Sequence, residues 1–369
     1  MNKVLILAND NTTIYHFRRE LIEKLVSDNF EVTVSVPKHE RNTEFEKMGC
    51  KVEETDISRS GKNPVEELKL LSAYKKLIKR VTPDVVLTYT AKPNIYGGLA
   101  CQALNIPYIC NVTGLGVVFQ SENLIKKIML LLQKKAYKKS KKVFFQNLTN
   151  KEYFEAKGIV KNNAGLIPGS GVNLDFNRLE PYPQNDETVR FILVSRVRKD
   201  KGFDELFDAV KNIAVETKNI EVHLVGWYED ESYKLKIDEM VRDYPVIYHG
   251  NQPQEKVHEL IAYCHCLVHP SYHEGMANVL LEAAAAGRPC LASDIPGCKE
   301  AVDNGITGLL FSVQSSERLE SAMKSFYRLS HEEKQKMGLA GRRKMEKEFD
   351  RNIVVQAYLD EIYSVLEEK

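Results

Sequence analysis

Short apolar runs rich in β-branched residues alternate with longer helical patterns along the whole chain, and this alternation constrains the fold more than any other feature. It is typical of βαβ units, in which crossover helices join parallel strands. The predicted strands are residues 3–8, 31–36, 84–89, 107–112, 142–146, 189–195, 220–226, 245–250, 264–270 and 288–293. The chain is therefore predicted to be an α/β protein.

The alternation is interrupted at residues 167–187, where Gly, Pro and Asn cluster and periodicity is lost. A chain of 369 residues is longer than one hydrophobic core usually grows, so two domains are expected. We predict two Rossmann-like, doubly wound domains, residues 1–175 and 180–350. A C-terminal helix at about 352–369 is expected to pack back on the first domain. Since such sheets bind ligands at the carboxyl ends of their strands, the ligand site is expected in a cleft that the two domains face.

Composition indicates an ordinary globular protein, with 43% hydrophobic and 28% charged residues. The seven cysteines are odd in number and scattered, which is typical of reduced thiols in the cytoplasm. The first apolar run is too short for a signal peptide, and no stretch approaches the roughly 18 residues of a membrane span. We expect a cytoplasmic protein that is neither exported nor membrane-spanning.

Charge is divided unevenly between the two halves. Residues 1–175 carry 27 lysines and arginines against 18 acidic residues, and the remaining residues carry 25 against 33. Eight lysines surround an apolar stripe in residues 122–145: Lys126, Lys127, Lys134, Lys135, Lys138, Lys139, Lys141 and Lys142. Such a helix can lie on an anionic membrane surface, at about 1 kcal/mol per basic residue near the lipid, or it can pack as a buried stripe with a solvated lysine face. Nucleic acid is not expected, because the segment lacks interleaved exposed aromatic residues.

The segment "SYHEGMANVLLEAAAAG" (271–287) places a glycine between a predicted strand and a predicted helix. Gly275 allows the backbone to approach a ligand closely, and Gly287 closes the helix. The helix is expected to begin with free backbone amides that can bind an anion, namely those of Met276, Ala277 and Asn278.

Two carboxylates flank this helix start. Glu274 precedes the helix and Glu282 lies more than one turn inside it, so they are separated by up to roughly 12 Å. Paired-carboxylate hydrolases need their carboxylates about 5–10 Å apart across one bond. The arrangement suits a nucleotide sugar, with Glu274 on the sugar hydroxyls, a phosphate at the helix start and Glu282 on the ribose. A capping Glu274 and a solvated Glu282 are an equally weighted alternative.

Two cations follow the first strand of the second domain. Arg196 and Lys201 lie in "SRVRKDKGF", before a helix opened by Gly202. An arginine can bind phosphate through two parallel hydrogen bonds, and a lysine adds a point charge. Two cations in one loop of the domain that holds the glutamates favour a diphosphate site.

These residues resemble those of the GT-B glycosyltransferases, specifically the retaining family 4. Its Glu-x7-Glu motif matches Glu274 to Glu282, and its diphosphate-binding cations match Arg196 and Lys201. The N-terminal "YHFR" and "TGLG" resemble enzymes that extend sugars on undecaprenyl diphosphate, such as bacterial N-acetylgalactosaminyltransferases. The resemblance implies transfer of a sugar, an N-acetylhexosamine, from a UDP-sugar to a polyprenyl-diphosphate-linked sugar, at the inner face of the cell membrane in surface glycan assembly.

The acceptor side departs from the family at one position. Many relatives carry a histidine after the fourth strand of the first domain, where this chain has Thr113 and Gly114. His16, expected in the loop after the first strand, is the alternative proton acceptor, although a lone histidine at a helix start more often has a structural role. The resemblance also places Arg18 at the acceptor.

No Asp-x-Asp occurs in the chain, so a metal-independent reaction without a cofactor is expected, in which fixed cations and helix amides neutralise the leaving diphosphate. The Cys and His residues of "YCHCLVHPSYH" fall on opposite faces of a strand and are interpreted as core rather than as a zinc site. Two alternatives stay open: a UDP-sugar epimerase or hydrolase, and a non-catalytic nucleotide-sugar-binding protein.

Overall fold

The structure is a computed structural model that describes residues 1–57, 64–114, 124–184, 187–217 and 219–368. The chain divides into two compact units. The first unit comprises Met1–Ser170 and Asn352–Lys369, and the second comprises Gly171–Arg351. The end of the "TGLG" motif, at residues 115 and 116, lies outside the described residues.

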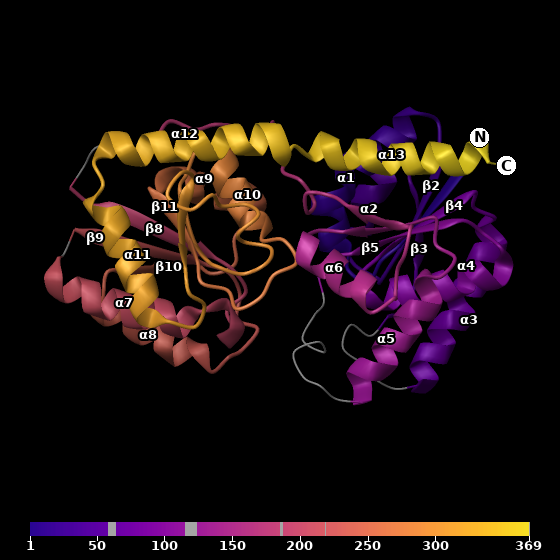
Figure 1. The fold of residues 1–369 in the computed structure, drawn as a ribbon, viewed down its shortest axis with the longest axis horizontal. Coiled ribbons are helices and arrows are strands. Elements are labelled where there is room, and N and C mark those ends of the chain that lie inside the picture. Colours follow the sequence, from indigo (N-terminus) through magenta and orange to yellow (C-terminus); the bar gives the residue numbers. More distant parts are fainter. Residues whose placement is uncertain (58–63, 115–123, 185–186, 218, 369) are drawn as a thin grey trace. The chain divides into compact units, whose positions relative to one another are not determined.

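In the first unit, the described residues form a parallel sheet flanked by helices (Figure 1). Its strand order is β3-β2-β1-β4-β5-β6-β7. The strands are β1 (Lys3–Leu7), β2 (Glu31–Val36), β3 (Lys51–Glu54), β4 (Val85–Tyr89), β5 (Tyr108–Val112), β6 (Lys142–Phe145) and β7 (Ala164–Leu166). The helices are α1 (Asn11–Ser27), α2 (Asn42–Lys47), α3 (Pro64–Val81), η1 (Pro93–Gly97), α4 (Gly98–Leu104), α5 (Leu124–Tyr137), α6 (Leu148–Ala156) and α13 (Arg351–Glu367).

In the second unit, the described strands are again parallel, in the order β10-β9-β8-β11-β12-β13. They are β8 (Val189–Val194), β9 (Ile220–Val225), β10 (Val246–Tyr248), β11 (Cys266–His269), β12 (Cys290–Ser293) and β13 (Gly308–Phe311). The helices are η3 (Lys199–Lys201), α7 (Phe203–Glu216), α8 (Tyr233–Asp243), α9 (Gln254–Tyr263), α10 (Asn278–Ala285), α11 (Ser316–Arg328) and α12 (His331–Glu348).

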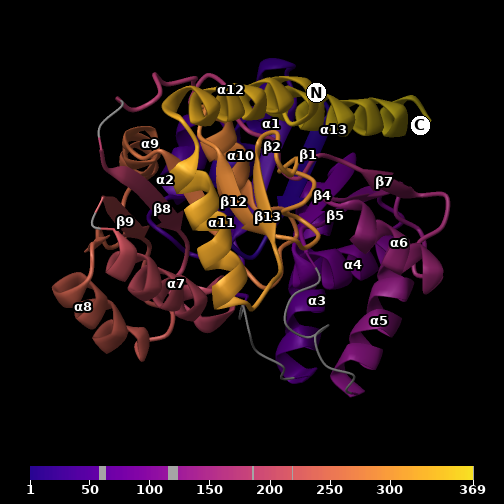
Figure 2. The ribbon, with the colours of Figure 1, turned by 60° about the vertical axis from the view of Figure 1, so that its left-hand side comes forward.

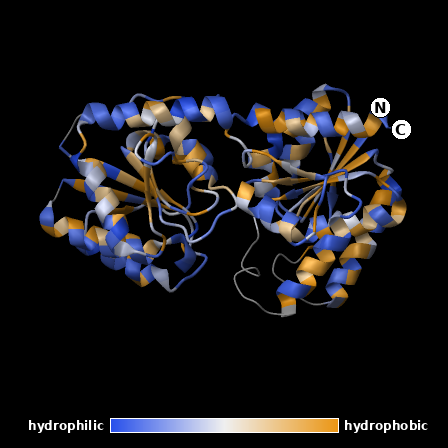
Figure 3. Cartoon of the chain, in the orientation of Figure 1, coloured by the Kyte–Doolittle hydropathy of each residue, from blue (hydrophilic) through white to orange (hydrophobic). Residues whose placement is uncertain are grey.

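Each sheet is covered on both faces because its central strands are apolar on both sides. In β1, Val4 and Ile6 face the core shared with α1, α2 and α13, whereas Leu5 and Leu7 face the core shared with α3 to α6. In the second unit, α7, α8 and α11 pack on one face and α9, α10 and α12 on the other (Figure 2). The strands are accordingly the most hydrophobic part of each unit (Figure 3).

The prediction of two Rossmann-like α/β domains is confirmed. The predicted strands lie within two residues of the observed ones at each end. Three strands are absent from the prediction: β3, β7 and β13. No helix in the described ranges is both long and apolar enough to cross a bilayer.

Helix α13 belongs to the first unit. Its apolar side chains lie in the core that α1 shares with one face of the sheet; they are Val354, Val355, Tyr358, Leu359, Ile362 and Val365. The C-terminus of the chain therefore completes the N-terminal fold.

Candidate functional site

The candidate site in the second unit includes the turn that joins β11 to α10. Helix α10 starts at Asn278, two residues later than expected, and Ala277 precedes it in a non-helical conformation. The amide of Ala277 donates to the carbonyl of Gly297 at 3.0 Å. The expectation of three free amides is therefore wrong for Ala277.

Gly297 shapes this turn from a distant loop. It adopts a positive φ of 88°, and an added Cβ would lie 2.9 Å from both the Cβ of Glu274 and the carbonyl oxygen of Gly275. Only glycine allows the loop after β12 to close on the Glu-Gly turn. The position of Glu274 is thus fixed partly by a residue far from it in sequence.

Lys201 and Glu274 are in direct contact in the structure. The Lys201 ammonium lies 2.6 Å from Oε1 of Glu274, and the two side chains are only 12% and 15% exposed. Lys201 reaches this point because Gly202, at a φ of 74°, lets η3 approach Pro270 so closely that a Cβ would sit 2.2 Å from the Pro270 carbonyl oxygen. The same ammonium donates to the Ser271 hydroxyl at 3.3 Å.

His269, the last residue of β11, holds the same carboxylate. Its Nε2 lies 3.0 Å from Oε1 of Glu274. Burial alone would raise the pKa of Glu274, but the hydrogen bond from His269 and the charge of Lys201 outweigh it and hold this pKa well below its usual range. Glu274 is therefore an ionised carboxylate, clamped by two donors at the start of α10.

Glu282 lies in the second turn of α10 and is partly buried. Burial raises the pKa of Glu282 to about 7, and the charge of Arg351 counteracts this only in part. Nearby, the buried side-chain oxygen of Asn278 has no hydrogen-bond partner among the described residues. A carboxyl group with a raised pKa and an unpartnered polar atom on one short helix are typical of a ligand site.

Arg196 lies in the loop after β8, as predicted, but its guanidinium contacts another carboxylate. Nη1 of Arg196 lies 2.7 Å from Oε2 of Glu229, and Nη1 of Arg198 lies 3.1 Å from Oε1 of the same residue. Arg198 also pairs through Nε with Asp200. The structure thus brings Lys201 to Glu274 and Arg196 to Glu229.

Asp200 connects these two groups. Its Oδ2 lies 3.1 Å from Nε2 of His273, and its carbonyl oxygen accepts hydrogen bonds from the Tyr272 amide and the Ser271 hydroxyl. Although burial would raise the pKa of Asp200, the hydrogen bonds from His273 and Arg198 lower it to about 2. The loop after β8 and the loop after β11 are therefore fastened together beside the start of α10.

The predicted acceptor residues lie in the first unit. His16 is half-buried in the second turn of α1, not in a loop as expected, and its ring meets that of Tyr15 edge-on at 5.6 Å. Arg18 is only 3% exposed, and its guanidinium lies over the rings of Tyr89 and Tyr358 at 4.9 and 5.8 Å. This burial argues against direct contact between Arg18 and a ligand.

Thr113 and Gly114 follow β5 and are half-buried, at the carboxyl edge of the first sheet. This placement was predictable, because residues that directly follow a parallel strand lie at the carboxyl edge, where doubly wound sheets bind ligands. Their role at the acceptor stays a prediction.

The lysine-rich segment is not one helix. Helix α5 ends at Tyr137, and Lys142 begins β6, where it pairs with Glu361 at 2.6 Å. Lys141 pairs with Glu368, and Lys126 is buried with its ammonium 5.9 Å from the ring of Tyr153. The remaining exposed lysines of the segment are Lys127, Lys134, Lys135, Lys138 and Lys139.

The cysteines are buried and free: Cys50, Cys101, Cys110, Cys264, Cys266, Cys290 and Cys298. In the part of the chain that the structure describes, no group of three His, Cys, Asp or Glu side chains could hold a metal ion. In the Cys-His run before Glu274, Cys264, Cys266, Leu267 and Val268 pack into the two cores of the second unit. His269 and His273 instead contact carboxylates of the site, Glu274 and Asp200.

Sequence reasoning missed several contributors to the site: Arg198, Asp200, Glu229, His269, Ser271 and His273. His269 ends a strand directly before Pro270, at the ligand-binding edge of the sheet, and that position is a signal that could have identified it. No comparable signal marks Glu229, because its contact with Arg196 depends on how the loops after β8 and β9 fold.

Comparison with known proteins identifies relatives of both units. Residues 177–344 match the family model of glycosyl transferases group 1, and residues 3–147 match the glycosyl transferase 4-like model. The chain is 28% identical over 374 residues to the N,N'-diacetylbacillosaminyl-diphospho-undecaprenol alpha-1,3-N-acetylgalactosaminyltransferase of Campylobacter jejuni, with 97% of each protein covered.

Solved structures share the fold over the whole chain. A glycosyltransferase from Rickettsia africae superposes with a TM-score of 0.82 at 18% identity, covering 100% of this chain and 99% of that one. Anabaena HepE, solved in complex with UDP and glucose, superposes with a TM-score of 0.80 at 16% identity, covering 99% and 100%. With its two parallel sheets and its matches to both family models, the chain belongs to the GT-B glycosyltransferases. The glycosyl transferase 4-like model matches the first unit, and the model of glycosyl transferases group 1 matches the second.

Proposed function

We propose that this glycosyltransferase moves an N-acetylhexosamine from a UDP-sugar to a sugar carried on a polyprenyl diphosphate, in the assembly of a bacterial surface glycan. The observation that carries the donor half of the proposal is the buried contact of Glu274 with Lys201 and His269 at the start of α10. The acceptor half is supported by the similarity to the Campylobacter jejuni enzyme, whose name specifies a diphospho-undecaprenol substrate.

Each donor-side residue has a distinct task. Glu274 is ionised and held by two donors, so it can accept hydrogen bonds from sugar hydroxyls without shifting. Glu282, in the second turn of α10, accepts hydrogen bonds from the ribose hydroxyls. Arg196, Lys201 and the amides at the helix start neutralise the diphosphate.

The reaction proceeds with retention of the anomeric configuration. The bond between the anomeric carbon and the diphosphate oxygen breaks, and the acceptor hydroxyl attacks the same face as UDP leaves. The charge that develops on the leaving oxygen falls next to Arg196 and Lys201, whose positive charges stabilise it. His16 is our candidate for the group that accepts the proton from the attacking hydroxyl of the acceptor.

A transfer assay separates this function from the alternatives. The protein is incubated with UDP-N-acetylgalactosamine or UDP-N-acetylglucosamine, with and without a polyprenyl-diphosphate-linked sugar, and both UDP and the sugar nucleotides are followed. Release of UDP only with the acceptor supports transfer. Release without acceptor supports a hydrolase, isomerised donor supports an epimerase, and binding without turnover supports a non-catalytic protein.

We further propose that the protein associates peripherally with the inner face of the cell membrane through the outer face of α5. Ile125, Ile128 and Leu131 recur at helical spacing on this face and are 39%, 47% and 67% exposed. Exposed lysines accompany them, namely Lys127, Lys134 and Lys135. Apolar residues flanked by lysines suit the boundary of an anionic bilayer, where a lipid-linked acceptor is found.

Liposome sedimentation tests this membrane surface. Replacement of Lys127, Lys134 and Lys135 by glutamate is expected to abolish binding to anionic vesicles, since each basic residue contributes about 1 kcal/mol. The matched control replaces three exposed lysines of the second unit, Lys234, Lys336 and Lys347, by glutamate and is expected to bind normally. Equal loss in both variants, or equal binding of the unaltered protein to neutral vesicles, contradicts the assignment to α5.

A further inference from the structure

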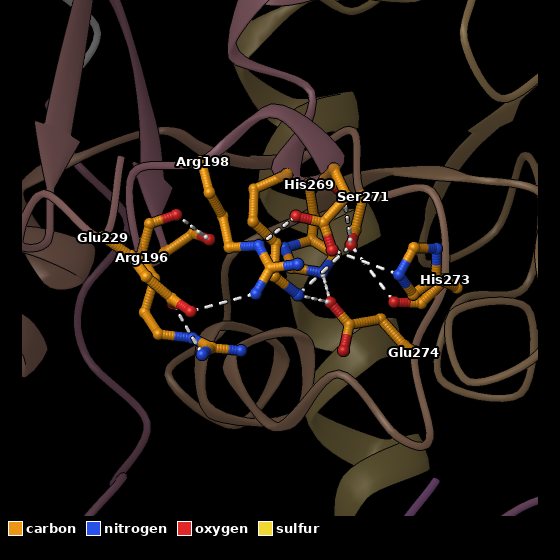
Figure 4. Close-up of polar contacts among 10 residues, drawn as sticks. Arg196, Arg198, Glu229, His269, Ser271, His273 and Glu274 are labelled. Atoms are coloured by element: carbon orange, nitrogen blue, oxygen red, sulfur yellow. Dashed lines mark hydrogen bonds and ion pairs between the residues drawn. The ribbon is translucent and has the colours of Figure 1, made fainter. Parts of the chain in front are cut away.

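Glu229 lies between two arginines at the edge of the candidate donor site (Figure 4). Its Oε2 is 2.7 Å from Arg196 and its Oε1 is 3.1 Å from Arg198. Glu229 follows β9, whereas both arginines follow β8, and the two strands pair in register up to Val194 and Val225. The two loops therefore leave the same edge of the sheet, which brings the carboxylate to the cations.

The two arginines depend on Glu229 to different degrees. Arg198 also pairs with Asp200, which in turn contacts His273, so Arg198 stays anchored without Glu229. For Arg196, Glu229 is the only paired carboxylate among the described residues. Arg196 is thus the cation that can exchange this partner for another anion.

The network is electrically balanced before any ligand enters. It contains three cations and three carboxylates: Arg196, Arg198, Lys201, Asp200, Glu229 and Glu274. A diphosphate that approaches meets no excess positive charge. To bind the ligand, the site has to release a cation from its internal partner.

We propose that Glu229 is an internal counter-ion that occupies Arg196 in the empty site and is displaced from it by the diphosphate of the donor. This inference rests on the proposed function, because it requires a diphosphate at Arg196. The pair is suited to exchange, since Arg196 is 33% and Glu229 39% exposed, and ion pairs of this exposure are weak. By competing for Arg196, Glu229 lowers the affinity for UDP and speeds its departure after transfer.

The test is the variant Glu229→Gln, which removes the charge but keeps the size and a hydrogen bond to Arg198. Calorimetry with UDP, UMP and uridine measures how its effect depends on ligand charge. We expect UDP to bind about three- to tenfold more tightly, UMP to gain less and uridine to be unchanged, because only charged ligands compete with Glu229. The matched control is Glu231→Gln, an exposed residue of the same loop, which should leave all three affinities unchanged.

Several results would overturn the inference. Weaker UDP binding by Glu229→Gln means that Glu229 orients Arg196 for the ligand instead of competing with it. Equal shifts for UDP, UMP and uridine mean a structural role, and equal gains in Glu229→Gln and Glu231→Gln mean a diffuse charge effect. If the unaltered protein binds UDP and Glu229→Gln changes nothing, only the counter-ion role fails; if the unaltered protein binds no UDP, the proposed function fails with it.

Discussion

Replacement of Glu282 by glutamine is expected to stabilise the second unit against unfolding and to lower its affinity for a nucleotide. Glu282 is partly buried in α10, and burial raises its pKa from 4.5 to about 7. The unfolded chain therefore ionises Glu282 more readily than the folded one. Relative to high pH, the protonated Glu282 adds to the free energy of unfolding. This contribution is fully present below about pH 4.5 and is lost as the pH rises through about 7.

The magnitude follows from this pKa. At about 1.4 kcal/mol per pH unit, ionised Glu282 destabilises the fold by up to roughly 3 kcal/mol at pH 8. Relaxation around the partly buried side chain reduces this value, so we expect Glu282→Gln to gain about 1–3 kcal/mol at pH 8, or about 3–9 °C in Tm, and clearly less at pH 5. Its UDP affinity should fall about tenfold, since hydrogen bonds from ribose to a carboxylate are lost.

Thermal unfolding can be followed through the single tryptophan, Trp227, which lies in the second unit. Glu231→Gln serves as the control for loss of one acidic charge and should change Tm little at either pH. If Glu282→Gln gains no stability at pH 8, or gains as much at pH 5, the burial argument is wrong. Unchanged UDP affinity would remove the ribose assignment.

Three further predictions concern the same unit. Arg196→Ala and Lys201→Ala should each lower kcat by about 10²-fold and weaken UDP binding less, because charge on the diphosphate grows at the transition state; equal losses in steady-state rate and in calorimetric affinity would exclude this role. The affinity of the unaltered protein for UDP should fall as the pH drops from 8 to 6, as Glu282 becomes protonated, and calorimetry at constant ionic strength measures this; an affinity that rises would contradict it. Burial and the neighbouring His249 lower the pKa of His223, so stability should be lost as the pH falls below about 6.5. His249→Gln should lessen that loss in thermal unfolding, and an unchanged pH dependence would refute the coupling.

The central strands of both sheets could be predicted from sequence because their side chains are apolar on both faces. Two of the three missed strands, β3 and β7, lack that signal. β3 reads "KVEE" and has no buried residue, and β7 has three residues; both lie at sheet edges, where one face or one side meets solvent. An edge strand is defined by the neighbour it pairs with, which a local pattern does not reveal.

Site residues could be predicted where their place after a strand puts them at the carboxyl edge of the sheet. Glu274, Arg196 and Lys201 follow strands at the carboxyl edge of one sheet, where ligands bind, and Glu282 lies in the second turn of the helix that starts there. The amide of Ala277 was misjudged because its partner, Gly297, lies in a distant loop.

The lysine-rich segment was misjudged for a different reason. Residues 122–145 were interpreted as one helix with an apolar stripe, although the end of this segment overlaps the predicted strand 142–146; the strand prediction is the correct one, because β6 begins at Lys142. Pairing of β6 with β5 and β7 ends the helical pattern, and residues after Tyr137 leave the helix to reach the sheet.

The central claim is that the second unit holds a UDP-sugar with the diphosphate between the cations after β8 and the start of α10. A crystal structure of the protein with UDP tests it most directly. The account predicts the phosphates within hydrogen-bond distance of Arg196, Lys201 and the Asn278 amide, the ribose hydroxyls on Glu282, and Glu229 detached from Arg196. UDP bound away from Glu274 and Glu282, or with its ribose turned toward Lys201, would contradict it.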